Sequence, residues 1–184
     1  MNVKKNVISY INYPIRIYYI GRLDKDSEGL LLLTNQGELV NKMMRSGNQH
    51  EKEYVVTVNK PVTKEFIKKM QDGVPILGTK TRKCRVIQTG EKSFRIILTQ
   101  GLNRQIRRMC QYLGYEVKRL KRIRVMNIEL GDLPVGSYRE VTAQEMKTLQ
   151  EIIKDSSETT VIKKERGKKC EPDRKNEGTR RIVK

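Results

Sequence analysis

The sequence predicts an α+β domain built on a mostly antiparallel sheet. Two observations carry this prediction: segments with strand patterning and segments with helical periodicity are intermixed along the chain, and several strands are joined by short turns typical of hairpins. The length of 184 residues suits one domain with a proper core and a short tail. No internal repeat is visible.

The first half of the chain alternates between strands and helices. The leucine run at 30–33 is suited to a buried strand, and the helical spacing of apolar residues over 34–47 predicts a helix with Asn35 as its N-cap. Residues 53–59 alternate and are rich in β-branched side chains, so they form a strand. A proline follows that strand, and Thr63 then caps a short helix.

The second half continues the same pattern. Residues 84–89 and 93–99 form two strands joined by a turn, and residues 103–114 form a helix with one apolar face. The segment 117–130 is strand-like, and Thr142 begins the capping box of a final helix.

The predicted domain ends where this pattern ends. Residues 1–154 are expected to form one domain, whereas residues 155–184 are polar, rich in basic residues and poor in large apolar side chains. Such a composition cannot bury enough apolar surface to fold, so we expect a disordered basic tail.

The charge of the chain indicates a polyanionic partner. The formal net charge is +18, and residues 103–124 hold eight Lys or Arg against one acid, with Tyr112 and Tyr115 interleaved. Without acids, pairing along the helix cannot explain this density, so RNA or DNA is the expected partner. The predicted RNA-binding residues of this stripe are Arg104, Arg108, Lys118, Arg119, Lys121, Arg122 and Arg124.

Other partners and sites are less compatible with the sequence. An anionic membrane surface is the rival polyanion, but no apolar run approaches the roughly 20 residues of a spanning helix, and the start does not resemble a signal peptide. We therefore expect a cytoplasmic protein. The three cysteines are scattered, and the single histidine, His50, has no companions for a metal site.

Residues 21–35, GRLDKDSEGLLLLTN, place charged side chains directly before the leucine run. Asp24 and Asp26 are structural in one interpretation, as turn or capping carboxylates. In another, the leucine strand anchors a loop that presents a carboxylate at a cleft. A third makes the two aspartates the acid/base pair of a hydrolase, which requires the loop to turn sharply.

Several motifs together resemble a known family. The segment GRLDKDSEGLLLLTN, followed by HEKEYVVTV, GVPILG and QGLNRQIRRMC, is similar to the bacterial ribosomal RNA pseudouridine synthases of the RsuA/RluB/RluE/RluF group, and most similar to the RluF type, which acts on large-subunit (23S) ribosomal RNA. The resemblance covers about residues 11–153. It implies a bent, mostly antiparallel sheet flanked by helices with a central cleft, and isomerisation of a uridine to pseudouridine without any cofactor.

The resemblance also implies roles for four residues. Asp24 matches the catalytic aspartate, Tyr54 the active-site tyrosine, and Arg107 the basic residue that pairs with the aspartate; Arg22 lies two positions before the aspartate. An ionised carboxylate at the edge of the core needs a fixed cation, and an arginine is always protonated. Considered alone, Tyr54 would be a strand residue at the core edge, Arg107 a phosphate contact or solvated residue, and Arg22 a surface arginine or a contact of the RNA backbone.

The chain also departs from the family pattern. Members of this group carry an N-terminal S4-type RNA-binding module and a further strand before the GRLD loop, and we expect this chain to lack both. A non-catalytic RNA-binding or ribosome-associated protein that retains the fold is therefore the alternative function. We also expect the chain to act as a monomer.

Overall fold

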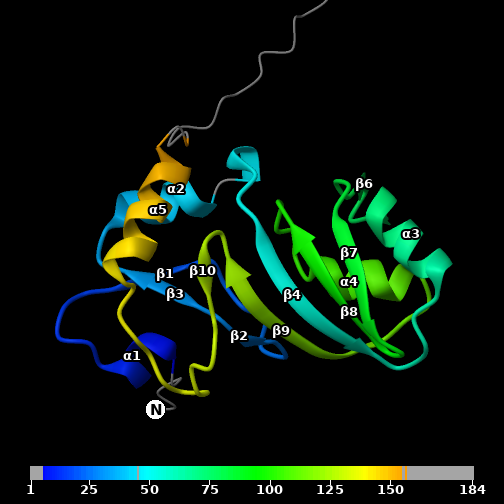
Figure 1. Cartoon of the computed structure of the whole chain (residues 1–184), viewed down its shortest axis with the longest axis horizontal. Coiled ribbons are helices and arrows are strands. Elements are labelled where there is room, and N and C mark those ends of the chain that lie inside the picture. The colour runs from blue at the N-terminus through cyan, green and yellow to red at the C-terminus, as the bar shows by residue number, and fades with distance from the viewer. Residues whose placement is uncertain (1–5, 45, 155, 157–184) are drawn as a thin grey trace, which may run out of the picture.

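The computed structural model describes residues 6–44, 46–154 and 156. The strands of its main sheet are β2 (Glu28–Gly29), β4 (Lys52–Val58), β7 (Arg85–Gly90), β8 (Ser93–Leu98), β9 (Val117–Val125) and β10 (Ile128–Glu129). They follow the order β10-β9-β4-β8-β7 with antiparallel neighbours, and β2 joins β9 in parallel (Figure 1). The predicted α+β class with a mostly antiparallel sheet is confirmed.

Two small sheets and five α-helices complete the described part of the chain. The small sheets pair β1 (Tyr18–Ile20) with β3 (Leu32–Thr34) and β5 (Pro75–Ile76) with β6 (Thr79–Lys80). The helices are α1 (Val7–Ile11), α2 (Gly37–Met44), α3 (Lys64–Asp72), α4 (Gln105–Tyr112) and α5 (Ala143–Ile153), with a 3-10 turn, η1, at Ser46–Asn48. None of these helices is long and apolar enough to cross a membrane.

The hydrophobic core is divided into two clusters along the sheet. The first packs β4 and β8 against α3 and α4, with Val56, Phe94 and Met109 fully buried at its centre. The second packs the end of β9 and the short β10 against α2 and α5. Figure 1 shows these helix pairs at opposite ends of the sheet. Each pair and its core cluster make up one half of the molecule, and the strands between them form the floor of the region where the two halves meet.

The centre of that floor is set by the register of β4 and β9. Tyr54 lies directly opposite Arg122, and Val56 lies opposite Leu120. Since side chains alternate along a strand, Tyr54 and Arg122 point to the same face as the first core cluster. They are the last residues of that face before the second cluster begins at Val125.

Local signals in the sequence located most elements correctly. Thr63 caps α3 by accepting a hydrogen bond from the Phe66 amide at 3.1 Å. Thr142 and Glu145 form the expected reciprocal capping box at the start of α5. Both caps use a side chain to satisfy an amide that the first helical turn leaves unpaired.

Two predicted strands are divided in the structure. The segment 117–130 turns at Met126, which has a φ of 55°, so β9 folds back into β10. The leucine run does not form one strand, because Leu30 ends the segment paired with β9 whereas Leu32 begins β3 in another sheet. The predicted tail, residues 155–184, lies outside the described residues apart from Ser156.

Candidate active site

The loop from Gly21 to Leu30 is fastened to the middle of the sheet. Gly29 pairs in parallel with Arg122 of β9, and the Leu30 amide donates to the Arg122 carbonyl at 2.8 Å. At Gly29, φ is +107°, and an added Cβ would lie 2.2 Å from that carbonyl oxygen. Glycine is therefore required for so close an approach of the two backbones.

Asp24 lies in the turn of this loop and is half-buried. Its carbonyl accepts from the Ser27 amide at 2.9 Å, which closes the turn. Among the described residues its carboxylate has no hydrogen-bond or ion-pair partner, and it therefore stays available to a substrate. Asp26 differs, since its exposed carboxylate lies 3.4 Å from Arg104. The two aspartates thus have different surroundings, which does not favour the paired-carboxylate hydrolase.

Arg107 extends from α4 to the same loop, but it does not bind Asp24. Its guanidinium donates to the main-chain carbonyl of Asp26 and, at 3.3 Å, to that of Val117. No ion pair within 4.0 Å joins it to Asp24 in the described structure, so the predicted pair is not formed here. Its Nε is buried without a partner. The guanidinium is instead occupied by carbonyls that hold the loop beside β9.

The remaining two candidates lie on different elements, Tyr54 on β4 and Arg22 in the loop itself. Tyr54 is half-buried on β4, packs against the first core cluster and lies opposite Ile96 of β8 as well as Arg122. Arg22 is exposed, two residues before Asp24. The structure therefore brings Asp24, Arg107 and Arg22 to one loop, and places Tyr54 on the sheet floor.

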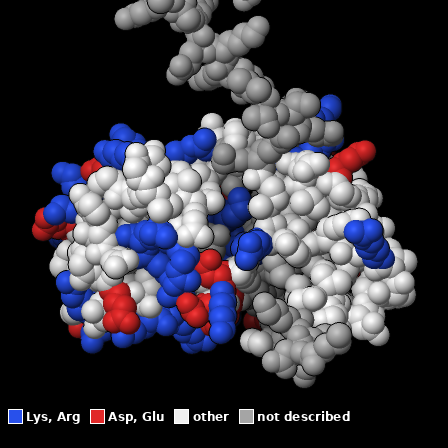
Figure 2. Space-filling model, turned by 180° about the vertical axis from the view of Figure 1, so that it is seen from behind, with Lys and Arg blue, Asp and Glu red and all other residues white. Residues whose placement is uncertain are grey.

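Only some residues of the basic stripe are exposed to solvent. Figure 2 shows Lys and Arg side chains gathered over the half that carries α3 and α4 and within the furrow between the halves. Arg104, Lys118 and Arg119 are exposed, whereas Arg108 and Lys121 are half-buried.

Two predicted RNA contacts need correction. Arg122 is only 2% exposed, and Arg124 is committed to ion pairs with Glu51 and Glu53.

Glu53 is the centre of a buried ion network on the opposite face of the sheet. It is 5% exposed and binds Arg95 at 2.6 Å and Arg124 at 2.8 Å. Burial alone would raise the pKa of Glu53, but the hydrogen bonds and charges of Arg124 and Arg95 outweigh it and hold this pKa below its ordinary value of 4.5. The network joins β8, β4 and β9 beneath the site.

This network predicts a pH dependence of stability. A carboxyl whose folded pKa is depressed stabilises the fold above its unfolded pKa, and this contribution is lost as the pH falls through the folded pKa. We expect Glu53→Gln to lower the free energy of unfolding at pH 7 by about 2 kcal/mol. The difference from the wild type should shrink below pH ~4. Urea unfolding at several pH values measures it, and a difference that is constant with pH would contradict the assignment.

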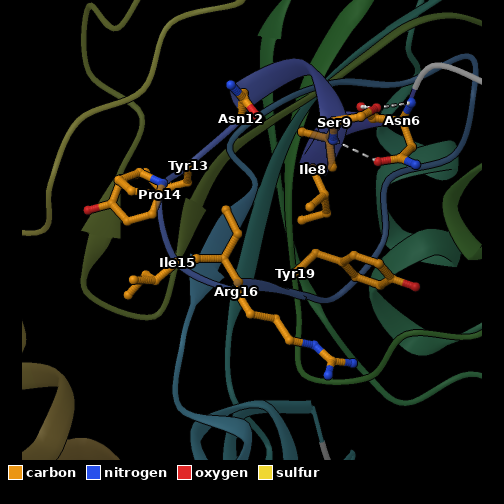
Figure 3. Close-up of a pocket in the computed structure, with 11 residues that line it drawn as sticks. Asn6, Ile8, Ser9, Asn12, Tyr13, Pro14, Ile15, Arg16 and Tyr19 are labelled. Carbon is orange, nitrogen blue, oxygen red and sulfur yellow. Dashed lines mark hydrogen bonds between the residues drawn. The ribbon is translucent and has the colours of Figure 1, made fainter.

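Two hollows lie away from this loop. One, of about 690 Å³, is formed by the N-terminal segment, and Figure 3 shows Tyr13, Ile15, Arg16 and Tyr19 around it. The other, of about 440 Å³, lies beside His50, whose ring nitrogen is 3.0 Å from the Ser156 hydroxyl. Neither is lined by Asp24. In the described ranges no three His, Cys, Asp or Glu side chains converge on a possible metal position.

The GRLD loop and the helix that carries Arg107 both lie in the segment that matches a known protein family. The sequence profile of RNA pseudouridylate synthases matches residues 2–112, more than half of the chain. The chain belongs to this family. A solved structure described as a pseudouridylate synthase has the same fold, with a TM-score of 0.74 at 27% identity over 78% of this chain and 64% of that one.

Named pseudouridine synthases are also similar to the chain. The dual-specificity RNA pseudouridine synthase RluF of Escherichia coli (strain K12) is 55% identical over 154 residues, which are 84% of this chain and 53% of that protein. The ribosomal large subunit pseudouridine synthase B of Bacillus subtilis (strain 168) is 39% identical over 145 residues, 76% of this chain and 59% of that protein. The chain thus spans about half the length of these pseudouridine synthases. These matches confirm the resemblance found in the motifs.

Proposed function

We propose that this protein converts a specific uridine of large-subunit ribosomal RNA to pseudouridine, with Asp24 as the catalytic carboxylate. The observation that carries the proposal is that Asp24, half-buried in a loop fastened to the sheet centre, has a carboxylate without a hydrogen-bond or ion-pair partner among the described residues. The similarity to RluF and to the large-subunit synthase B supports the reaction and the class of RNA.

The reaction requires a positioned carboxylate and a uracil that can turn. The N-glycosidic bond between N1 and C1′ breaks, the base rotates, and C5 forms a bond to C1′, after which C5 loses a proton and N1 gains one. No atom of the uridine is lost apart from that exchange of hydrogen with solvent. Asp24 can attack the sugar, attack the base or assist removal of the C2′ proton, and each route uses its ionised form.

The target nucleotide must leave its helix to reach Asp24. Everting it costs a few kcal/mol, which contacts to the flipped base and the vacated space must offset. In the proposed site Tyr54 offers a flat face for the uracil, worth about 1–3 kcal/mol, and exposed Arg22 braces the vacated space. Arg107 supports the proposed site by binding the Asp26 carbonyl of the loop. Its Nε has no hydrogen-bond partner within the described chain.

The exposed and half-buried residues of the stripe are proposed to bind the RNA backbone. Each phosphate neutralised by a Lys or Arg releases counterions, so affinity falls as salt rises. We expect Arg104→Ala or Arg108→Ala to weaken RNA binding and to reduce the salt slope by about 1 each. Binding isotherms at several salt concentrations test this, with exposed Arg85→Ala on the far strand β7 as the control. Slopes unchanged from the wild type would remove these residues from the interface.

The assay that decides the function is tritium release from ribosomal RNA labelled at C5 of uridine. We expect release in proportion to pseudouridine formed, since the C5 hydrogen is lost in the reaction. RNA binding without any release would instead support the alternative, a ribosome-associated RNA-binding protein. We further propose that residues 1–154 form the catalytic domain and that the protein acts in the cytoplasm as a monomer, without a cofactor.

A further inference from the structure

Arg122 is an unusual residue because it is a buried cation without an anion. It is 2% exposed, and no carboxylate lies within 4.0 Å of it in the described part of the chain. Its Nε donates to the Leu30 carbonyl at 2.7 Å, while its Nη2 is buried without a partner. A guanidinium cannot lose its proton in a protein, and an unpaired buried charge is costly.

The neighbour of Arg122 on the same face, Lys52, adds a second positive charge and does not neutralise the first. Lys52 has a pKa lowered first by burial and then by the charge of Arg122. An apolar residue at this position would relieve both costs. The presence of an arginine there is therefore better explained by a task than by stability.

The position of Arg122 indicates the task, since it bonds the end of the loop that carries Asp24 and lies close to the start of that loop. The side chain binds the Leu30 carbonyl, and its Nη1 lies 3.9 Å from the position that a Cβ on Gly21 would occupy. Its main chain accepts from the Leu30 amide and pairs with Gly29. One residue thus spans the two ends of the segment that carries Asp24.

Unmet hydrogen-bonding groups gather at the same place. Among the described residues, the buried side-chain atoms without a partner are Ser27 Oγ, Arg107 Nε, Arg122 Nη2 and Asn127 Oδ1. Three of these four belong to the loop or to the arginines that hold it. Unsatisfied polar groups are rare in folded proteins and mark sites where function sets the local arrangement.

We propose that Arg122 is a positioning residue for uridine isomerisation. It fixes the Gly21–Leu30 loop above the sheet floor, opposite Tyr54, and so determines where the Asp24 carboxylate meets the everted uridine. Arg107 holds the loop at Asp26, and Arg122 holds it at Leu30 and lies beside its first residue, Gly21. The inference rests on the proposed function, and it differs from a direct RNA contact, which 2% exposure does not favour.

Kinetics and binding measured on the same RNA test the proposal. Arg122→Met removes the hydrogen bond, and Arg122→Lys keeps the charge with a single donor group for the Leu30 carbonyl. With protein in saturating excess, we expect the single-turnover rate of tritium release to fall about a hundredfold for Met and less for Lys, since small misplacements of reacting groups have effects of that size. The RNA dissociation constant should stay within about twofold, because no phosphate contact is lost.

Controls separate positioning from the two other roles. Arg85→Met on exposed β7 removes one arginine and should leave rate and affinity unchanged. Weakened binding with a reduced salt slope and an unchanged single-turnover rate would make Arg122 a phosphate contact and overturn the proposal. A lower unfolding temperature with full activity per folded molecule would make it merely structural and would also overturn it. If the Met variant does not fold, the Lys variant decides.

Hydrogen exchange tests the same claim without the reaction. We expect the Ser27 and Leu30 amides, which donate to Asp24 and Arg122 carbonyls, to exchange faster in Arg122→Lys than in the wild type, while β8 amides keep their protection. Unchanged protection at both amides would overturn the positioning role. An inactive wild type with faster exchange in the variant would instead count against the proposed function alone.

Discussion

Asp24→Asn will abolish tritium release from C5-labelled ribosomal RNA, with the rate falling by at least about a thousandfold. The amide has nearly the shape of the carboxylate, but it can neither attack a carbon atom nor accept the C2′ proton. Because the Asp24 side chain has no partner among the described residues, the substitution removes no contact of the fold. The measurement is single-turnover release at saturating protein, with unfolding and RNA binding followed in parallel.

The matched control lies two residues away in the same loop. Asp26→Asn makes the same chemical change at an exposed carboxylate, whose one ion pair within the described residues is with the exposed side chain of Arg104 at 3.4 Å. Such pairs contribute little, so activity should stay within about threefold of the wild type. Equal loss in both variants would point to the charge of the loop as a whole, and full activity of Asp24→Asn would remove Asp24 from the mechanism.

Gly29→Ala should produce the largest loss of stability among single small substitutions in the loop. The added Cβ would meet the Arg122 carbonyl oxygen at 2.2 Å and the Arg122 nitrogen at 2.7 Å, so β2 must separate from β9. The φ of +107° adds backbone strain for any residue with a Cβ. We expect the free energy of unfolding to fall by about 3 kcal/mol or more, as measured by urea unfolding.

Gly37→Ala provides the control for that substitution. Gly37 begins α2, and nothing lies within 4 Å of the position of its added Cβ. Its unfolding free energy should change by no more than about 0.5 kcal/mol. If Gly29→Ala were as mild as Gly37→Ala, the close parallel pairing of the loop with β9 would be wrong.

Local patterns in the sequence were sufficient for most of the fold. The Thr63 and Thr142 caps are short-range, because the side chain bonds an amide only three residues away, and the helices begin where these residues predict. The division of the leucine run was not predictable in this way. It depends on pairing between Gly29 and Arg122, residues far apart in the chain. It also depends on the positive φ of Gly29, which the amino-acid sequence alone does not reveal.

The site was predictable as a set of residues, but not as a set of contacts. The motifs identified the loop with Asp24 and the helix with Arg107, yet Arg107 binds the Asp26 carbonyl and not the Asp24 carboxylate. Arg122 lies in a run of basic residues, and the sequence of that run predicts that each of them faces solvent or binds RNA. Only the register opposite Tyr54 and the closeness of Gly29 show that this one is buried.

The most direct test of the central claim is a map of pseudouridines in large-subunit ribosomal RNA from cells that carry the wild-type gene, no gene, or the Asp24→Asn allele. We expect at least one pseudouridine to be present with the wild-type gene and absent in both other strains. Identical maps in all three strains would contradict it.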